Sequence, residues 1–229
     1  MEKPRGLILL TLSAVLLLGN RGMASELPAC FSLTPGKTIE SVLVAGGVEL
    51  PELLARLVYA ESISTGFGDD PLVHQAIAWG VMNRVRLGDL SASMQRTYGR
   101  GIQGVVFKNG QFNPAISERS QFSREFLCPG NGERWRLATA AAETALNGRG
   151  NPLIMTPWER EHNLSLVVNF YYPQSVQAKG RLAPWEGNKA LTFVGDVPMG
   201  EKVLPASRVR FYRLVHPPPD LKREREGGQ

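Results

Sequence analysis

The chain has 229 residues, of which 43% are hydrophobic, so it is long enough to form one domain with a substantial core. Lysine and arginine exceed aspartate and glutamate by 26 to 21, a mild excess that is compatible with an anionic polymer as partner but selects none. No dense basic patch with interleaved aromatic residues occurs, which argues against nucleic acid as the partner.

The first 24 residues have the layout of a secretory signal peptide. The segment MEKPRG is basic, LILLTLSAVLLLG is apolar, and NRGMAS supplies small residues for cleavage after Ala24 or Ser25. The apolar run is short for a membrane span, so we expect cleavage and no membrane span afterwards, with an uncleaved anchor as the alternative. Cleavage would remove three basic residues and one acidic residue and lower the net charge from +5 to +3. We therefore expect an exported protein of the periplasm or cell envelope.

Export affects the interpretation of the two cysteines. Cys30 follows closely after the expected cleavage point, and Cys128 lies in the middle of the chain. In an oxidising compartment we expect a disulfide that ties the mature N-terminus to the rest of the domain. Two unpaired structural thiols are the alternative.

After a polar, turn-rich lead at residues 25–50, three helices are predicted. Residues 51–61 carry apolar side chains at helical spacing, and a proline occupies the first turn. Residues 71–88 follow a Ser- and Gly-rich loop and form the strongest helical pattern, with Gly88 as the expected stop. Residues 133–150 are Ala-rich and end in NGRG, which closes the third helix.

The remaining segments are less regular. Between the second and third helices, a polar loop at 88–101 precedes a short element and an Asn-Gly turn. Extended runs are predicted at 165–173, 190–196 and 208–215, before a charged, Pro-rich tail at 215–229 that we expect to be disordered. Helices first and extended segments later predict an α+β fold, mostly α, with the main domain at residues 51–214.

Several kinds of chemistry lack their sequence motifs. His74, His162 and His216 are scattered, without the spacing of a metal site. The chain has no GxSxG nucleophile motif, and neither a GxGxxG nor a P-loop pattern for nucleotides. We therefore expect no metal and no cofactor. The carboxylates remain as the candidate catalytic groups.

Glu61 is the candidate acid. It lies on or beside the apolar stripe near the C-terminus of its helix, where both the helix dipole and burial disfavour a charged carboxylate. Burial raises the pKa of a glutamate, so the side chain can keep a proton near neutral pH. Such an acid can protonate the oxygen of a glycosidic bond as that bond breaks.

Most glycosidases also use a second carboxylate. Asp69 and Asp70 are the nearest candidates, although Asp70 directly before Pro71 is also a helix-capping arrangement. Cleavage of a muramic-acid glycoside can proceed without the second group, because the C6 hydroxyl of the sugar can attack the anomeric carbon. One glutamate then acts first as acid and afterwards as base.

Five stretches, in this order, resemble the SleB-type cell-wall hydrolases: LARLVYAES, HQAIAWGVMNRV, GIQGVVFKNGQFNP, ATAAAETALNG and NFYYP. The resemblance covers about residues 51–214. It implies a lysozyme-like, α-rich fold and cleavage of peptidoglycan glycan strands at the MurNAc–GlcNAc bond, as in lytic transglycosylases. It also implies that Glu61 is the catalytic acid, and the pair Glu61-Ser62 matches the start of the motif in the wider lytic transglycosylase superfamily.

The resemblance also assigns substrate-binding residues. Gln111 is expected to bond an N-acetyl group or a hydroxyl, and Phe112 to stack on a sugar face, with packing in the core as the alternative for Phe112. Tyr171 and Tyr172 belong to an aromatic run expected to line the cleft, and strand alternation predicts that only one of them faces it.

Asn83 and Arg84 match the Asn-Arg pair of the family, for which we expect a structural role, with support of the site as the alternative. The chain departs from the family by lacking a second glutamate shortly after Glu61 and by an insertion at residues 151–166. Two further functions stay open. One is a lysozyme-like hydrolase that uses Asp69 or Asp70, and the other is a non-catalytic peptidoglycan-binding or assembly module.

Overall fold

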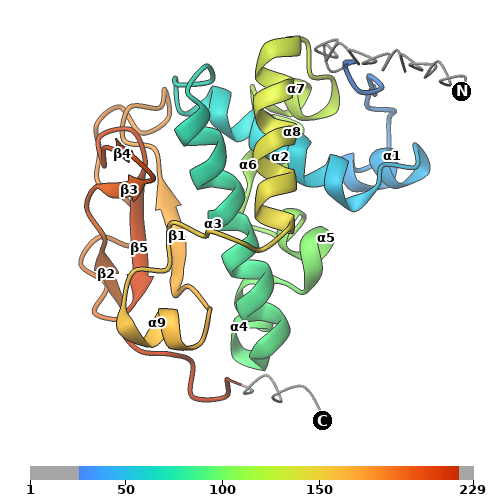
Figure 1. Ribbon diagram of the computed structural model, residues 1–229. Coiled ribbons are helices and arrows are strands. Elements are labelled where there is room, and N and C mark those ends of the chain that lie inside the picture. Colours follow the sequence, from blue (N-terminus) through green and yellow to red (C-terminus); the bar gives the residue numbers. More distant parts are fainter. Residues whose placement is uncertain (1–25, 222–229) are drawn as a thin grey trace, which may run out of the picture.

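Three long helices, α2 (Leu50–Ser64), α3 (Pro71–Leu90) and α8 (Gly132–Leu146), pack together at the centre of the molecule (Figure 1). The computed structural model describes residues 26–221, so the expected signal peptide at residues 1–24 lies outside the described residues. Helix α8 contacts both α2 and α3 through buried alanines, whose small side chains allow close approach. The three helices predicted from apolar spacing are thus confirmed.

The ends of α3 show one correct prediction and one error. Asp70 caps the helix, because its carboxylate accepts a hydrogen bond from the backbone N–H of Leu72 at 2.9 Å. Gly88 does not stop the helix, which continues to Leu90. A Cβ at Gly88 would stand 2.4 Å from the carbonyl oxygen of Gly99, so the glycine permits close packing against that turn.

Within residues 26–221, six shorter helices surround the central three: α1 (Ile39–Ala45), α4 (Ala92–Tyr98), α5 (Gly101–Val106), α6 (Asn113–Ile116), α7 (Ser123–Leu127) and α9 (Pro157–Glu161). Helices α1 and α4 lie in segments that were predicted to be a turn-rich lead and a polar loop. Each is only seven residues long, too short to show a clear apolar period. Each is started by a side-chain cap, from Thr38 in α1 and from Ser91 in α4.

The strands form an antiparallel sheet beside α3. Strands β1 (Val167–Tyr171), β5 (Arg210–Leu214) and β2 (Leu191–Phe193) lie in the order β1-β5-β2, and β3 (Val197–Met199) pairs with β4 (Lys202–Leu204) as a separate hairpin. The extended runs at 165–173, 190–196 and 208–215 are thus confirmed, whereas the hairpin was not predicted. The architecture is α+β with about 43% helix.

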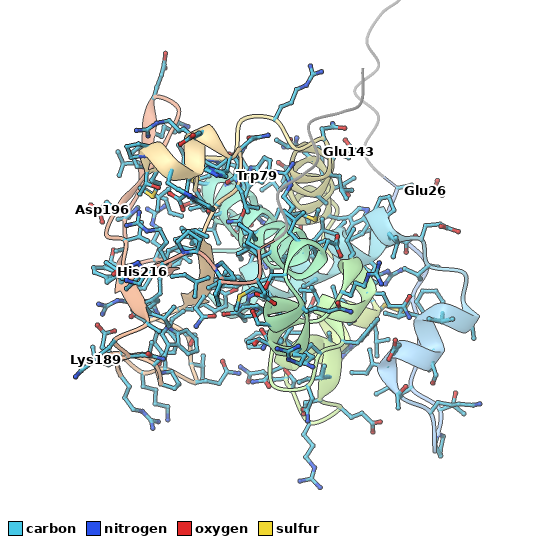
Figure 2. All side chains as sticks on the ribbon, turned by 90° about the horizontal axis from the view of Figure 1, so that it is seen from below. Glu26, Trp79, Glu143, Lys189, Asp196 and His216 are labelled. Carbon is cyan, nitrogen blue, oxygen red and sulfur yellow. A yellow bond between two sulfur atoms is a disulfide. The ribbon has the colours of Figure 1, made fainter. Side chains whose placement is uncertain are left out.

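Helix α3 lies between the sheet and helix α8, whereas the short helix α9 lies on the sheet side of α3 (Figure 1). Figure 1 shows β1 next to α3, and Figure 2 shows Trp79 of α3 among packed side chains, with Lys189 and Asp196 at the periphery. Gly80 allows the close approach, because a Cβ there would stand 2.7 Å from the ring of Phe170 in β1. None of the helices within residues 26–221 combines the length and the apolar character needed to cross a membrane.

Residues 215–221, which follow β5, contact the start of α4 and an apolar cluster of the domain. The carboxylate of Asp220 accepts hydrogen bonds from the Ser91 hydroxyl at 2.6 Å and from the backbone N–H of Ser93 at 2.8 Å, at the start of α4. Leu221 packs against an apolar cluster that includes Leu87. The prediction of disorder at residues 215–229 is therefore wrong for residues 215–221, and residues 222–229 lie outside the described residues.

The N-terminal lead is attached to α2 and α7 by a disulfide and a buried arginine. The disulfide expected between Cys30 and Cys128 is present. Arg56 of α2 is completely buried and donates to the carbonyl oxygens of Ala29 at 2.6 Å and Leu127 at 2.8 Å. Residues 26–50 therefore belong to the same folded unit as the domain predicted at 51–214.

We predict that replacing both Cys30 and Cys128 with serine lowers the free energy of unfolding by about 4 kcal/mol, because the cross-link restricts the unfolded chain. The bridged residues are 98 positions apart, and the entropic effect grows with the length of the closed loop. Urea unfolding of the variant measures the loss, and the unmutated protein in reductant should match it. Equal stability of the oxidised and reduced proteins would contradict the prediction.

Candidate functional site

A cleft of about 480 Å³ lies at the meeting point of α2, α3, α4 and β1. The turn that follows α5 and the loop that follows β1 complete its walls. The cleft is lined by Glu61, Ser64, Arg84, Thr97, Tyr98, Gly110, Gln111, Phe112, Asn113, Pro114, Phe122, Asn169, Phe170, Tyr171, Tyr172, Ser175, Gln177, Ala178, Pro184 and Trp185. The set includes the expected acid, Glu61, and all the residues expected to bind substrate, Gln111, Phe112, Tyr171 and Tyr172, although they come from segments far apart in the sequence.

Glu61 lies in the last turns of α2 and is only 6% exposed. Burial raises the pKa of Glu61 to about 7, although the Tyr172 side chain, the Arg84 charge and the Ser64 side chain lower it again in part. The Tyr172 hydroxyl is close enough to influence the carboxyl, but its geometry falls short of a hydrogen bond. Glu61 is therefore a carboxyl group that keeps its proton up to neutral pH, as general acid catalysis requires.

The two tyrosines differ from the prediction of strand alternation. Strand β1 ends at Tyr171, so the alternation does not extend to Tyr172, and both side chains line the cleft. The expectation that only one of them faces the cleft is wrong for this reason. Burial and the neighbouring Glu61 raise the pKa of Tyr172 well above its usual value, so its hydroxyl remains a neutral donor beside the carboxyl.

Phe112 and Gln111 have different roles in the cleft wall. The Phe112 ring is only 2% exposed and packs 6.0 Å from the ring of Phe170, centroid to centroid. This favours the core-packing alternative, because a covered ring cannot present its face to a sugar. Gln111 is half-buried, and its side-chain amide makes no hydrogen bond within residues 26–221, so it can donate and accept in the cleft.

Asp69 and Asp70 lie outside the cleft. Asp69 forms a two-point ion pair with Arg134, at 2.7 and 2.9 Å. Asp70 caps α3 and pairs with Arg208. Within the part of the chain that the structure describes, Glu61 is the only acidic side chain that lines the cleft.

One further carboxylate stands nearby. Glu125 of α7 lines an adjoining hollow of about 360 Å³ that shares Ser64, Phe122 and Ser175 with the cleft. The side chain of Glu125 forms no ion pair within residues 26–221. The sequence did not indicate this residue, because a glutamate in a short surface helix has no distinguishing pattern.

Trp185 was also missed by sequence reasoning. It lies in the loop between β1 and β2, with its ring between those of Tyr171 and Tyr212 at centroid distances of 6.1 and 5.9 Å. Its indole N–H has no hydrogen-bond partner among the described residues. A tryptophan in a Pro- and Gly-rich loop is itself a signal, since such a side chain is rarely placed in a loop without a packing or binding partner.

Asn83 and Arg84 attach α3 to β1. The Asn83 amide donates to the carbonyl of Val167 at 3.1 Å and accepts from the amide of Asn151 at 2.8 Å. Arg84 donates through Nε to the carbonyl of Val168. The structural role predicted for the pair is confirmed, and the insertion at residues 151–166 is part of the same network.

Metal ligands do not converge in the described residues. No group of three or more histidine, cysteine, aspartate or glutamate side chains suitable for a metal occurs within residues 26–221. His74 is fully buried outside the cleft, and one ring nitrogen lies 2.8 Å from the carbonyl oxygen of Gly68.

No protein-family model, curated protein or solved structure matches this chain.

We predict that Glu61→Gln stabilises the protein, and more so at pH 8 than at pH 4. The folded protein holds the Glu61 proton up to pH 7 whereas the unfolded chain releases it near 4.5, so this group lowers stability as pH rises between these values. The loss amounts to about 3 kcal/mol when complete, and Gln, which does not titrate, avoids it.

Urea unfolding of both proteins at pH 4 and pH 8 measures this difference. Glu133→Gln is the matched control, because Glu133 is exposed and pairs only with Arg136 on the surface of α8. An equal effect of Glu61→Gln at the two pH values would show that the pKa of Glu61 is not raised by folding.

Proposed function

We propose that the protein is an exported peptidoglycan glycosidase that cleaves the MurNAc–GlcNAc bond as a lytic transglycosylase and leaves 1,6-anhydro-muramic ends. The observation that carries the proposal is the cleft with one acidic side chain, Glu61, among the described residues that line it. Burial places the pKa of this carboxyl at about 7, so both of its protonation states are available near neutral pH.

Glu61 performs both proton transfers in the proposed reaction. In its protonated form it donates to the glycosidic oxygen, the bond to the anomeric carbon breaks, and the GlcNAc portion leaves as an alcohol. Positive charge develops on the anomeric carbon and ring oxygen of the muramic sugar. The Glu61 carboxylate then accepts the proton of the C6 hydroxyl as that oxygen attacks the anomeric carbon. No water is consumed, and Glu61 regains its proton.

The side chains around Glu61 suit a glycan strand. The Gln111 amide is available for an N-acetyl group, and the Tyr171 and Trp185 rings offer amphipathic surfaces for sugar faces. The order of motifs that resembles SleB-type cell-wall hydrolases supports the same substrate and a lysozyme-like fold. The disulfide between Cys30 and Cys128 is in keeping with an oxidising compartment such as the periplasm.

We predict that purified peptidoglycan incubated with residues 25–229 releases soluble fragments with anhydro-muramic ends. Glu61→Gln should reduce their rate of formation by about 10²- to 10⁴-fold, the usual contribution of a general acid. Mass spectrometry distinguishes the products, because an anhydro end is lighter by one water than a reducing end.

The alternatives give different results in the same assay. Reducing ends, lost in Glu125→Gln or Asp69→Asn, would establish a hydrolase with a second carboxylate. Binding of the polymer without soluble products, unaffected by Glu61→Gln, would establish a non-catalytic module. Asp69→Asn serves as the control for the transglycosylase, because Asp69 lies outside the cleft and its loss should leave the anhydro products in place.

We further predict that Trp185→Ala raises KM about tenfold, since one lost aromatic–sugar contact is worth roughly 1.4 kcal/mol. The value of kcat and its pH profile should change little, because Trp185 does not act on the pKa of Glu61. Steady-state kinetics on solubilised glycan strands measure both quantities. A fall in kcat with KM unchanged would place Trp185 in the chemical step instead.

A further inference from the structure

Arg84 is a buried cation beside the proposed acid. It is 5% exposed and its guanidinium carbon lies 4.7 Å from the ring centroid of Phe170, 4.9 Å from that of Phe112 and 5.4 Å from that of Tyr98. Its Nε donates to the carbonyl of Val168. Its Nη1 is covered by protein and has no hydrogen-bond partner, and no carboxylate lies within ion-pair distance among residues 26–221.

Such an arrangement is costly for the folded state. A buried charge loses several kcal/mol of hydration unless an opposite charge and hydrogen bonds replace the water. The surrounding rings and the Val168 carbonyl compensate for part of this cost. A neutral side chain of similar length would pack between the rings at lower cost, so packing alone does not account for a guanidinium here.

The charges of the cleft suggest what Arg84 does. Within the described part of the chain, Arg84 is the only cationic side chain that lines the cleft, and Glu61 is the only anionic one. Glu61 is protonated in the resting site at pH values below about 7, so the arginine then faces a neutral partner. The partner becomes charged when Glu61 has given its proton to the leaving oxygen.

We propose that Arg84 is a positioning residue for the reaction, whose guanidinium stabilises the Glu61 carboxylate that exists between the protonation of the leaving oxygen and the uptake of the C6 hydroxyl proton. The inference depends on the proposed function, since it assigns Arg84 a part in the same two-step reaction. In this role Arg84 acts through Glu61, while its Nε is bonded to the Val168 carbonyl and its Nη1 is covered by protein.

Few other polar groups surround this pair. Ser64 faces Glu61 from α2, Tyr172 faces it from the end of β1, and Tyr98 faces Arg84 from α4. All three are neutral hydroxyl groups, and burial raises the pKa of both Tyr98 and Tyr172. Removal of Arg84 therefore takes away the one charged neighbour of Glu61, and the carboxylate should become less stable relative to the protonated acid.

The first test measures the titration of Glu61 directly, through the ¹³C resonance of its side-chain carboxyl carbon. Arg84→Gln removes the charge and keeps an N–H for the Val168 carbonyl, and it should raise the midpoint by about one pH unit. Arg84→Lys keeps the charge and should leave the midpoint near that of the unmutated protein. Arg208→Gln removes an equal charge from outside the cleft, next to Asp70, and should leave it unchanged.

A second measurement needs no change at Arg84. In the unmutated protein the ¹⁵N resonances of the Arg84 guanidinium should shift with the same midpoint as the Glu61 carboxyl, because the two charges interact. Glu61→Gln should abolish that shift. This measurement decides the coupling even where Arg84→Gln does not fold.

Product formation tests the consequence for the reaction. Arg84→Gln should lower kcat by up to tenfold for each unit by which the midpoint rises, because the proton is only partly transferred in the transition state. It should also move the alkaline limb of the pH profile upward by as many units as the midpoint rises, and leave KM unchanged. An unchanged midpoint in folded Arg84→Gln, or equal shifts in the Gln and Lys variants, would overturn the inference. Absence of anhydro products from the unmutated protein would reject the proposed function, and with it the role of Arg84 in that reaction, while the titrations alone decide the electrostatic coupling.

Discussion

The Glu61 carboxyl is held out of water because α2, α3 and the end of β1 pack around it, and many other contacts of the fold keep these three segments together. A carboxylate at this position would face both a C-terminal helix dipole and an apolar environment. The protein accepts this cost and obtains in return a carboxyl whose pKa, about 7, allows it to give and to take a proton at neutral pH. A solvent-exposed glutamate would be almost fully ionised there and could not act as the acid.

The position of β1 relative to α3 is fixed by three features of one helix. Gly80 lets the Phe170 ring approach, while Asn83 and Arg84 bond the backbone carbonyls of Val167 and Val168. The same three features set where β1 ends, and therefore where Tyr171 and Tyr172 lie relative to Glu61. The Asn-Arg pair thus also shapes the cleft, because the strand that it holds carries one of the cleft walls.

The sequence was informative wherever the determining contacts are local. Helical spacing at residues 51–61 and 71–88 predicted two central helices, and the place of Glu61 on that spacing predicted its burial. Gly88 was misinterpreted as a helix stop because its packing partner is brought close only by the tertiary structure. Trp185 was missed for a similar reason, since nothing local indicates that its loop folds back over a cleft formed mainly by helices and β1.

The central helices carry two buried arginines, Arg56 and Arg84. Only Arg84, which lines the cleft, lacks an ion-pair partner among the described residues. Arg56 is buried more deeply, yet it forms an ion pair with Glu52 at 2.7 Å and donates to several backbone carbonyls that hold the N-terminal lead in place. This fold can therefore satisfy a buried guanidinium where the role is to hold segments together. At Arg84 the missing partner is an anion. Glu61, the one acid among the described residues that line the cleft, supplies that anion only when it is deprotonated. Arg84 faces no opposite charge while Glu61 is protonated, and it gains one when Glu61 has given up its proton. Arg84 therefore lowers the energy of the state after proton transfer relative to the state before it. In this way a preorganised charge accelerates a reaction.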